Sequence, residues 1–511
     1  MPLSKEVRLL QSRWDGKQGW PKRLEWVEIQ GIRGWTGQRI ELQFPIVAIV
    51  GENGVGKSTI LQAIAASFDS QPYPSDFFPD TAWETVTAAE IRTSHRDSPQ
   101  SGSLPTNITK LTQRWRGLDR RKKDRSVKYI DLGRIQPMGA RVGYARIAKG
   151  NVKETSTAPF EASTIERFSR IMGRDYSAAR LSVTNADEHL KEDRRKVPVV
   201  ARSGASSPYS GFHSGAGELV LAELLPVELE KFSILLIDEI ETSLHPRTQR
   251  RLIRDIATMC RQLEMQCVVT THSPYVLDEL PPEGRIYLME SDGQKRIISH
   301  ISPAFAMSKM DDEIYPEIDA YVEDERSGTM LNEIVSRSSQ RDLMLRFQPV
   351  PFGAANVGRS LGTMCKENRF KRPTVVFLDG DQDQSDGCSL LPGGDAPERV
   401  VFEGLLKLGT SSGVGNRLSR SEADVTDALS QASLLSNHHD WVKAAADRLS
   451  VSGDTLWQAM CAEWVQVVLP PAEADKIGDY LMTALVLRGG TRYYEKPPVP
   501  VQSGLLGLDP P

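Results

Sequence analysis

A glycine-rich loop between an apolar run and a helical pattern constrains the fold of this chain most. The loop, residues 51–59 (GENGVGKST), directly follows residues 46–50 (IVAIV), a continuous apolar run typical of a buried strand. Residues 59–66 then have the apolar spacing of a helix. Because glycines let backbone N–H groups turn toward phosphate oxygens at the positive end of a helix, this order predicts a phosphate-binding loop in a mostly parallel α/β sheet. The alternative is a glycine-rich turn without a ligand.

The side chains of this loop predict how ATP would be held. Lys57 is expected to reach the β- and γ-phosphates, and Ser58 is expected to ligate Mg²⁺. We therefore expect ATP and Mg²⁺ as cofactors. The other loop residues expected to contact the nucleotide are Asn53, Gly54, Gly56 and Thr59.

Two later apolar runs end in residues suited to ATP hydrolysis. The first ends in Asp238, expected at the magnesium ion, and Glu239, expected to polarise the attacking water. The second is followed by His272, expected to hydrogen-bond the γ-phosphate. In isolation these would be an acidic turn and a structural histidine. Their order after the phosphate loop favours catalytic roles for Lys57, Glu239 and His272.

A short Ser/Gly segment, residues 214–218 (SGAGE), precedes a further helical pattern. Alone it is an ordinary helix cap. With the other segments it resembles the ATP-binding-cassette (ABC) superfamily and, within it, the SMC-like repair and defence ATPases, over residues 20–290. The resemblance implies that Ser214 and Gly217 contact the γ-phosphate held by a second protomer, so that ATP lies between two heads of a homodimer or a higher homo-oligomer. The matching segments are 51–59, 214–218, 235–246 (LLIDEIETSLHP) and 270–274 (TTHSP).

The same resemblance assigns three further positions. Residues 241–245 are expected to couple the two ATP sites. Gln136 is the candidate for the family's glutamine loop, a nucleotide-contacting position. Arg33 stands where related ATPases carry an arginine near the nucleotide.

Acidic residues also end two strand-like runs beyond residue 319. Glu323 follows one such run, and Asp379 and Asp381 follow another. Acids at the ends of neighbouring strands can converge, and such a cluster is unfavourable unless a divalent cation neutralises it. Two Mg²⁺ or Mn²⁺ ions held there could activate water for phosphodiester cleavage. A solvated acidic strand end without a metal is the alternative.

This pattern resembles the Toprim domain, and an ABC-type ATPase followed by Toprim resembles the OLD nucleases, including Gabija and some retron effectors. Glu398 would match the later acidic motif and is a further candidate metal ligand. Two departures stand out. The first motif reads Glu-Asp rather than Glu-Gly, and no lysine can be assigned to the site, since Lys366 and Lys371 are only nearby in sequence. A Toprim fold without activity is the alternative.

The length of 511 residues predicts two or three domains in an α/β protein. The ATPase head is expected to combine a mostly parallel sheet with an antiparallel β-subdomain near the N-terminus. Within its insertion, residues 111–132 are predicted as two strands joined by a charged turn, and residues 160–195 as helical. The predicted boundaries are 1–300 for the ATPase head with an insertion at about 70–205, 315–415 for the Toprim-like domain, 416–495 for a helical region and 496–511 for a disordered tail.

These features lead to two functional hypotheses. One is an ATP-regulated, metal-dependent nuclease of the OLD type in prokaryotic anti-phage defence. The other is a sensor or switch ATPase with a degenerate Toprim-like domain, which holds and releases a separate toxin or nuclease subunit.

Charge and hydropathy narrow the partners and the location. The net charge of −4 provides no global attraction to nucleic acid, so any such contact needs a local patch. The basic stretch at residues 114–128 is one candidate, and a solvated hairpin tip is the equal alternative. No run approaches the length of a membrane span, and we expect a cytoplasmic protein without membrane contact.

Overall fold

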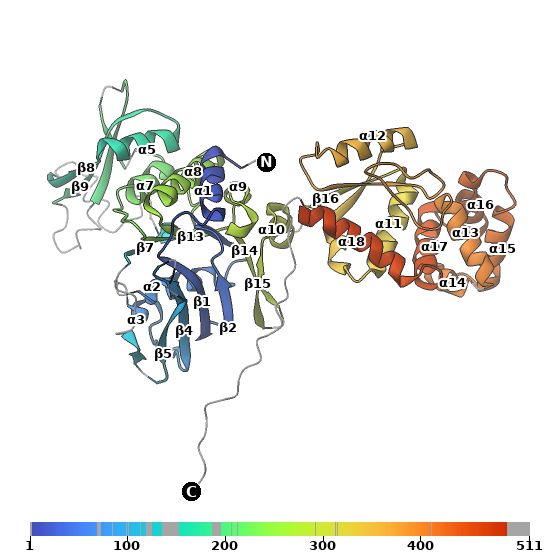
Figure 1. Ribbon diagram of the computed structural model, residues 1–511, viewed down its shortest axis with the longest axis horizontal. Coiled ribbons are helices and arrows are strands. Elements are labelled where there is room, and N and C mark those ends of the chain that lie inside the picture. The colour runs from blue at the N-terminus through green and yellow to red at the C-terminus, as the bar shows by residue number, and fades with distance from the viewer. Residues whose placement is uncertain are drawn as a thin grey trace, which may run out of the picture. The chain divides into compact units, whose positions relative to one another are not determined.

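The computed structural model describes residues 3–68, 73–83, 85–98, 100, 102–112, 114–118, 125–134, 153–185, 196–205, 207–211, 213–291, 293–311, 313, 315–409 and 411–487. The chain forms two compact units, Met1–Ala306 and Met307–Thr491 (Figure 1). The predicted tail, residues 496–511, lies outside the described residues. None of the described helices has the length and apolar character needed to cross a membrane.

The main sheet of the first unit carries the phosphate loop. Its strand order is β15-β14-β3-β13-β12-β7, and every pairing is parallel except that of β14 with β15. Every residue of β3, β12 and β13 is buried, which explains their continuous apolar sequences. The strands are β3 (Ile46–Val50), β7 (Val127–Asp131), β12 (Ile234–Asp238), β13 (Gln266–Thr271), β14 (Arg285–Ser291) and β15 (Gln294–Ser299).

Helices cover both faces of this sheet. Helix α2 (Lys57–Ala66) packs on the face that carries Ile234 and Leu236 of β12. Helix α8 (Pro246–Leu263) packs near Leu235, which points to the other face because side chains alternate along a strand. The other helices of at least four residues in this part of the chain are α1 (Lys5–Asp15), α3 (Pro74–Phe77), α5 (Ala162–Met172), α7 (Ala216–Leu224), α9 (Pro274–Asp278) and α10 (Pro303–Met310).

An antiparallel sheet near the N-terminus shares a hydrophobic core with α2 and the main sheet. Its strand order is β2-β1-β4-β5-β6. The predicted strand pair within residues 111–132 is wrong, because β6 ends this sheet whereas β7 pairs with β12 in the main sheet. The strands are β1 (Arg23–Ile32), β2 (Trp35–Glu41), β4 (Ala89–Arg96), β5 (Leu104–Lys110) and β6 (Trp115–Arg116).

A third sheet of the first unit, with order β11-β10-β9-β8, precedes the SGAGE segment. It corrects the prediction that residues 160–195 are helical. Helix α5 ends at Gly173 in a left-handed conformation (φ 69°), and a strand follows from Tyr176. The strands are β8 (Glu154–Pro159), β9 (Tyr176–Thr184), β10 (Lys196–Arg202) and β11 (Tyr209–Ser210).

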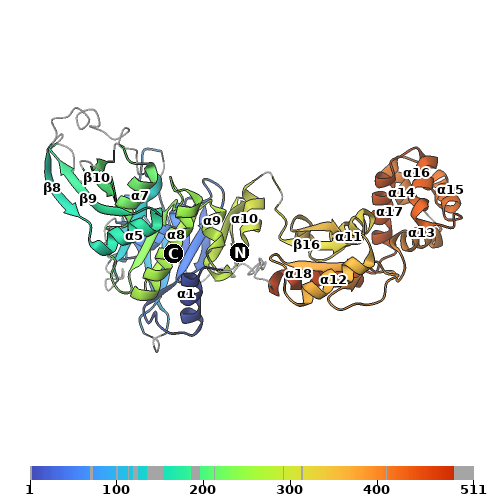
Figure 2. The same cartoon turned by 90° about the horizontal axis from the view of Figure 1, so that it is seen from above.

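The second unit is a parallel sheet whose core continues into a group of helices (Figure 2). The strand order is β17-β16-β18-β19, with β16 (Ile318–Val322), β17 (Phe347–Pro351), β18 (Thr374–Leu378) and β19 (Ser389–Leu390). One core cluster extends from Ile318 to Leu485, and the last described helix contacts both β16 and β18. The helices are α11 (Glu325–Arg337), α12 (Ala355–Lys366), α13 (Pro397–Leu408), α14 (Ser412–Leu418), α15 (Glu422–Ala432), α16 (Trp441–Leu449), α17 (Gly453–Val467) and α18 (Pro471–Leu487).

Candidate functional site

The phosphate loop lies at the carboxyl end of β3, and α2 begins at Lys57. Gly54 and Gly56 have φ values of 77° and 102°, which residues with side chains rarely adopt. The Nζ of Lys57 donates to the carbonyls of Gly51 (2.9 Å) and Glu52 (2.8 Å). The loop therefore wraps around a buried lysine at a helix N-terminus, which is the arrangement needed to bind phosphate.

The sheet order brings three strand ends together beside this lysine. Strand β13 lies between β3 and β12, so His272 follows the strand next to the loop and Asp238 ends the strand after that, on the same side. Burial lowers the pKa of Lys57, and the nearby carboxylates of Asp238, Glu241 and Glu239 offset part of that shift. The charges of these carboxylates therefore act on the lysine. A site for Mg²⁺ and ATP needs both kinds of charge close together.

Thr270 organises the acidic end of β12, a role that the matching segment 270–274 did not predict. Its Oγ1 donates to Oδ1 of Asp238 and accepts from the backbone N–H of Glu239 (2.8 Å). Tyr129 of β7 also donates to Oδ2 of Asp238, at 3.3 Å. Asp238, the candidate magnesium ligand, is therefore hydrogen-bonded to side chains of both neighbouring strands.

Glu239 has an unusual backbone conformation for a residue with a side chain, with φ 53°. Such strain persists where the surrounding structure enforces it, and it is frequent at active sites. The Oε2 atom of Glu239 would lie 2.5 Å from a Cβ atom placed on Gly133, in the turn after β7. Gly133 thus leaves the space that the predicted catalytic carboxylate occupies.

His272 is linked to Glu241, in the segment expected to couple two ATP sites. The backbone N–H of His272 donates to Oε1 of Glu241 at 2.6 Å. Burial and the charge of Lys57 lower the pKa of His272, and Glu241 and Glu239 act in the opposite direction. A neutral imidazole is therefore favoured. Oε2 of Glu241 is buried without a hydrogen-bond partner among the described residues, which fits a position that completes its contacts when nucleotide, Mg²⁺ or water binds.

The SGAGE segment is fixed by its own glutamate. Oε1 of Glu218 accepts from Arg202 (2.8 Å), Tyr209 (2.8 Å) and Tyr176, and Oε2 accepts from the N–H of Gly215 (3.2 Å). Burial raises the pKa of Glu218, but these hydrogen bonds outweigh it and lower the pKa overall. The start of α7 is thereby tied to β9, β10 and β11.

Ser214 and Gly217 lie at this tied helix start. Ser214 donates to the carbonyl of Gly211 (3.3 Å). A Cβ atom on Gly217 would meet the carbonyl of Ser243 at 3.1 Å, so α7 packs closely on the predicted coupling segment. Among the described contacts, neither residue bonds to the phosphate loop of its own chain.

The two remaining nucleotide-contact predictions have different outcomes. Gln136 lies outside the described residues. Arg33 donates to Oε1 of Gln62 in α2 (2.9 Å) and to the carbonyl of Phe77 (3.1 Å), and it lies over the ring of Phe78. Its guanidinium is thus engaged by α2 and α3.

In the second unit, the ends of β16 and β18 bring two carboxylates together. The backbone N–H of Asp379 donates to Oε1 of Glu323 (3.1 Å), and Oγ of Ser327 donates to Oδ1 of Asp379 (2.8 Å). Burial, together with the nearby charges of Glu323, Asp324 and Asp381, raises the pKa of Asp379 to about 7, although the Ser327 bond opposes the shift. Burial also raises the pKa of Glu323. Sequence reasoning missed Ser327, which has no motif of its own.

The other predicted ligands are placed differently. Asp381 is exposed and accepts from its neighbour Gln382 (3.0 Å). Glu398 is buried and accepts from Arg326 (2.7 Å). Among the described residues, Glu323, Asp379, Asp381 and Glu398 do not form a group whose ligand atoms all lie within 4.8 Å of one another.

The cation beside this pair is an arginine that sequence reasoning did not single out. The charge of Arg359, in α12, acts against the raised pKa of Glu323, and its Nη2 donates to Gln382 (3.3 Å). Lys366 instead pairs with Asp386 (2.8 Å). Arg359 is therefore better placed than Lys366 to attract an anionic substrate.

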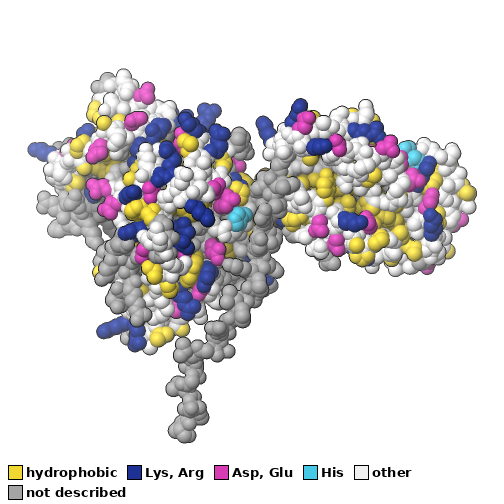
Figure 3. Space-filling view, viewed as in Figure 1, with side chains coloured by type: hydrophobic (Ala, Val, Ile, Leu, Met, Phe, Trp, Pro, Cys, Tyr) yellow, Lys and Arg dark blue, Asp and Glu magenta, His cyan; other side chains and the backbone are white. Residues whose placement is uncertain are grey.

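The predicted basic stretch is only partly described, since residues 119–124 lie outside the described part. Within it, Arg125 is buried and donates to the carbonyl of Phe232 (2.7 Å) and to Gln266 (3.2 Å). Arg125 therefore stabilises the fold, and its side chain is not available to a solvent-exposed basic patch. On the face shown in Figure 3, acidic and basic side chains are interspersed over much of the first unit.

Comparisons with known proteins agree with the geometry of the first unit. A model described as "AAA domain" matches residues 27–167, which include the phosphate loop. A second, described as "AAA domain, putative AbiEii toxin, Type IV TA system", matches residues 149–278, which include Ser214, Asp238 and His272. The first unit is an ATPase domain of the AAA type.

Similarity to individual proteins is low. The Septu protein PtuA of Bacillus mycoides (strain KBAB4) is 22% identical over 319 residues, which are 57% of this chain and 43% of that protein. The chain thus spans less than half the length of this relative. Among solved structures, the SMC head domain from Thermotoga maritima has a TM-score of 0.33 at 17% identity, covering 54% of this chain and 98% of that one. The Smc head domain from Pyrococcus furiosus has a TM-score of 0.36 at 13% identity, covering 56% and 98%.

Proposed function

We propose that this protein is an ATP-regulated, metal-dependent nuclease of prokaryotic anti-phage defence, in which ATP bound between two first units controls an acidic site in the second. The observation that carries the nuclease half is the Glu323–Asp379 pair, with the pKa of Asp379 raised to about 7. Two adjacent, partly buried carboxylates are unfavourable alone and are neutralised by a divalent cation. The resemblance of this pattern to Toprim, and the similarity to a Septu protein, support the proposal.

At the ATP site, each residue has a role that its contacts support. Lys57 binds the β- and γ-phosphates from the loop, while Ser58 and Asp238 hold Mg²⁺, which neutralises charge developing on the phosphates. Glu239 orients the attacking water from a strained backbone position and accepts its proton. Neutral His272 hydrogen-bonds the γ-phosphate. Ser214 of one protomer completes the site of the other.

At the acidic site, Glu323, Asp379 and Asp381 would hold Mg²⁺ or Mn²⁺, which would supply activated water and stabilise the leaving oxygen. Ser327 orients the Asp379 carboxylate through its 2.8 Å hydrogen bond. Arg359 attracts the phosphodiester to the mouth of the site. Glu398 is left out of this group, because it lies in the first turn of α13 beside His438 and His439 and not at the end of β16 or β18.

The test is a cleavage assay on DNA and RNA with Mg²⁺ or Mn²⁺, run alongside ATP hydrolysis. Asp379→Ala is expected to abolish cleavage and to retain ATP hydrolysis, and Lys57→Ala is expected to lose hydrolysis and ATP control of cleavage. Asp383→Ala, an exposed acid in the same loop, is the matched control. Absence of metal-dependent cleavage by the wild-type protein would contradict the nuclease proposal.

The similarity to the Septu protein also favours a second candidate function. In it, the first unit is a switch that holds a separate toxin or nuclease subunit and releases it as ATP turns over, and the second unit is a docking platform. An adjacent gene for a small nuclease, whose product binds this protein in an ATP-dependent manner, would support this function. Cleavage by the wild-type protein alone that is lost in Asp379→Ala would exclude it.

A further inference from the structure

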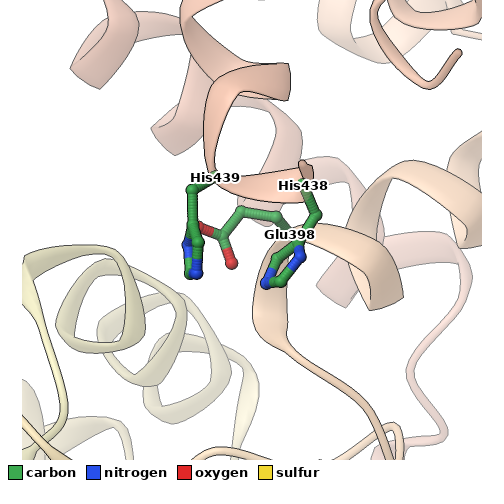
Figure 4. Close-up of side chains that lie close together, drawn as sticks. All are labelled: Glu398, His438 and His439. Carbon is green, nitrogen blue, oxygen red and sulfur yellow. The ribbon is translucent and has the colours of Figure 1, made fainter. Parts of the chain in front are cut away.

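Two consecutive histidines lie against a buried glutamate in the second unit. Glu398 is in the first turn of α13, and His438 and His439 begin the short helix His438–Asp440 just before α16. Figure 4 shows the carboxylate of Glu398 between the two imidazole rings. One potential ligand atom of each residue lies within 4.8 Å of those of the other two. Among the described residues, this is the group of three whose potential ligand atoms lie that close together. Neither of its histidines belongs to the acidic site proposed above.

The spacing suits a transition-metal ion. In a tetrahedral site with metal–ligand bonds of 2.0 to 2.2 Å, neighbouring ligand atoms are roughly 3.4 Å apart. Nδ1 of His439 lies 3.5 Å from Oε1 of Glu398, close to that value. The imidazole rings have centroids 4.1 Å apart, and one nitrogen of each ring lies within 4.8 Å of a carboxylate oxygen of Glu398. We infer that Glu398, His438 and His439 bind a divalent transition-metal ion, with Zn²⁺ the best matched.

The ligand types distinguish this ion from the Mg²⁺ proposed elsewhere in the chain. Imidazole nitrogen suits Zn²⁺, Cu²⁺ and Ni²⁺, whereas Mg²⁺ prefers an oxygen shell with several waters. Two histidines and one carboxylate leave the fourth position of a tetrahedral zinc ion open. The side chain of His439 is 65% exposed, so an ion and a water molecule have access from solvent.

Hydrogen bonds around the three residues fix their positions. Arg326 donates to Oε1 of Glu398 (2.7 Å) and to the backbone carbonyl of His439 (3.0 Å), so one guanidinium fixes the carboxylate and the histidine turn together. Oδ1 of Asn437 accepts from the N–H of His439 (3.3 Å). Ligating carboxylates in metal sites are usually hydrogen-bonded in this way. Arg326 is thus a positioning residue for the site.

The competing interpretation is a plain Arg326–Glu398 ion pair with two bystander histidines. In that case the positive guanidinium opposes cation binding, and removing it strengthens any weak metal contact. In a metal site, Arg326→Gln weakens binding about 10- to 100-fold, because the carboxylate loses its orientation. The two interpretations therefore predict opposite effects of one substitution.

The experiment titrates the full chain, stripped of metal with a chelator, with Zn²⁺ against a chromophoric competitor, in excess Mg²⁺. Co²⁺ serves as a second probe, since its visible spectrum reports tetrahedral coordination and shows a charge-transfer band if a thiolate binds instead. We expect one tight Zn²⁺ site that Mg²⁺ does not displace, and a tetrahedral Co²⁺ spectrum without the thiolate band.

The variants decide which residues hold the ion. His438→Asn/His439→Asn and Glu398→Gln are expected to lose the site, and His300→Asn, a histidine of the first unit, is expected to keep it. Circular dichroism checks folding, and single His438→Asn replaces the double variant if that protein does not fold. Unchanged Zn²⁺ affinity in the folded histidine variant, a thiolate band, or tighter binding in Arg326→Gln would each overturn the inference.

Discussion

Burial and neighbouring acids act together on the carboxyl group of Asp379, raising its pKa from 3.8 to about 7. Between these values the folded chain keeps a proton that the unfolded chain has lost, so the free energy of unfolding falls as pH rises through this window. The loss is at most about 4 kcal/mol. Without divalent metal, Asp379→Asn is therefore expected to be more stable than wild type at pH 8 and similar at pH 4.

Urea unfolding of the full chain in chelator, at both pH values, measures this difference. Asp383→Asn controls for the loss of an acid from the same loop, and it should not change the pH dependence. An equal effect of Asp379→Asn at pH 8 and pH 4 would show that burial of this carboxyl group has no part in the instability.

Gly133 lies against the catalytic candidate Glu239, and a Cβ atom there would be 2.5 Å from Oε2. Gly133→Ala is therefore expected to displace the carboxylate and to slow ATP hydrolysis at least 10-fold, which corresponds to about 1.4 kcal/mol at the transition state. Nucleotide binding should persist, because the phosphate loop is unaltered. Turnover and nucleotide affinity, measured on the same protein, check this. A parallel loss of affinity would mean that the whole site had shifted.

At the scale of single residues, the sequence predicts the residues whose role follows from a local motif. The phosphate loop and the acids after β12 could be located because a strand, a loop and a helix adjoin in sequence. Ser327 and the role of Thr270 could not, because each residue acts through a bond to a residue 52 or 32 positions away. Nothing near Ser327 distinguishes it from an ordinary helix-start hydroxyl group, and the TTHSP segment gives no sign that Thr270 binds Asp238.

Among the elements, α7 and the sheet of β9, β10 and β11 are joined through one buried carboxylate, Glu218. Glu218→Gln removes the charge that these donors share and is expected to cost about 2 to 3 kcal/mol of stability. Because Ser214 directly precedes α7 and Gly217 lies in its first turn, ATP turnover should fall while nucleotide affinity stays near that of wild type. Steady-state hydrolysis and fluorescent-nucleotide binding separate the two.

Glu228→Gln is the matched control, since Glu228 is exposed and follows α7. If Glu218→Gln hydrolyses ATP at the wild-type rate, the tie between α7 and its neighbouring sheet has no part in catalysis. A similar loss in both variants would point to a general effect of charge.

The elements that sequence predicted well are those buried on both faces, such as β3, β12 and β13, because their apolar runs have no other explanation. The errors concern pairing and length. Strands β6 and β7 are close in sequence but belong to different sheets, and sequence proximity alone suggested a hairpin. The exposed and buried residues of β9 do not alternate regularly, so its sequence lacks the period-two pattern that distinguishes a strand from a helix.

For the whole molecule, the proposed sharing of each ATP site between two protomers makes a prediction about mixtures. Lys57→Ala and Ser214→Arg should each abolish hydrolysis, since every site in either homodimer lacks one half. A mixed dimer has one site with both Lys57 and Ser214 intact. Mixing the two variants is therefore expected to restore ATP turnover above the sum of the separate rates, and turnover across protein concentrations measures this. No recovery after subunit exchange has been verified would contradict a site shared between protomers.

The packing of α18 has a consequence for how the second unit is made. This helix, the last one described, contacts β16 and β18, the strands that end in Glu323 and Asp379. A growing polypeptide therefore cannot complete the packing of this sheet until Pro471–Leu487 have been synthesised. If the proposed nuclease function holds, prematurely terminated chains would lack this support for the acidic pair.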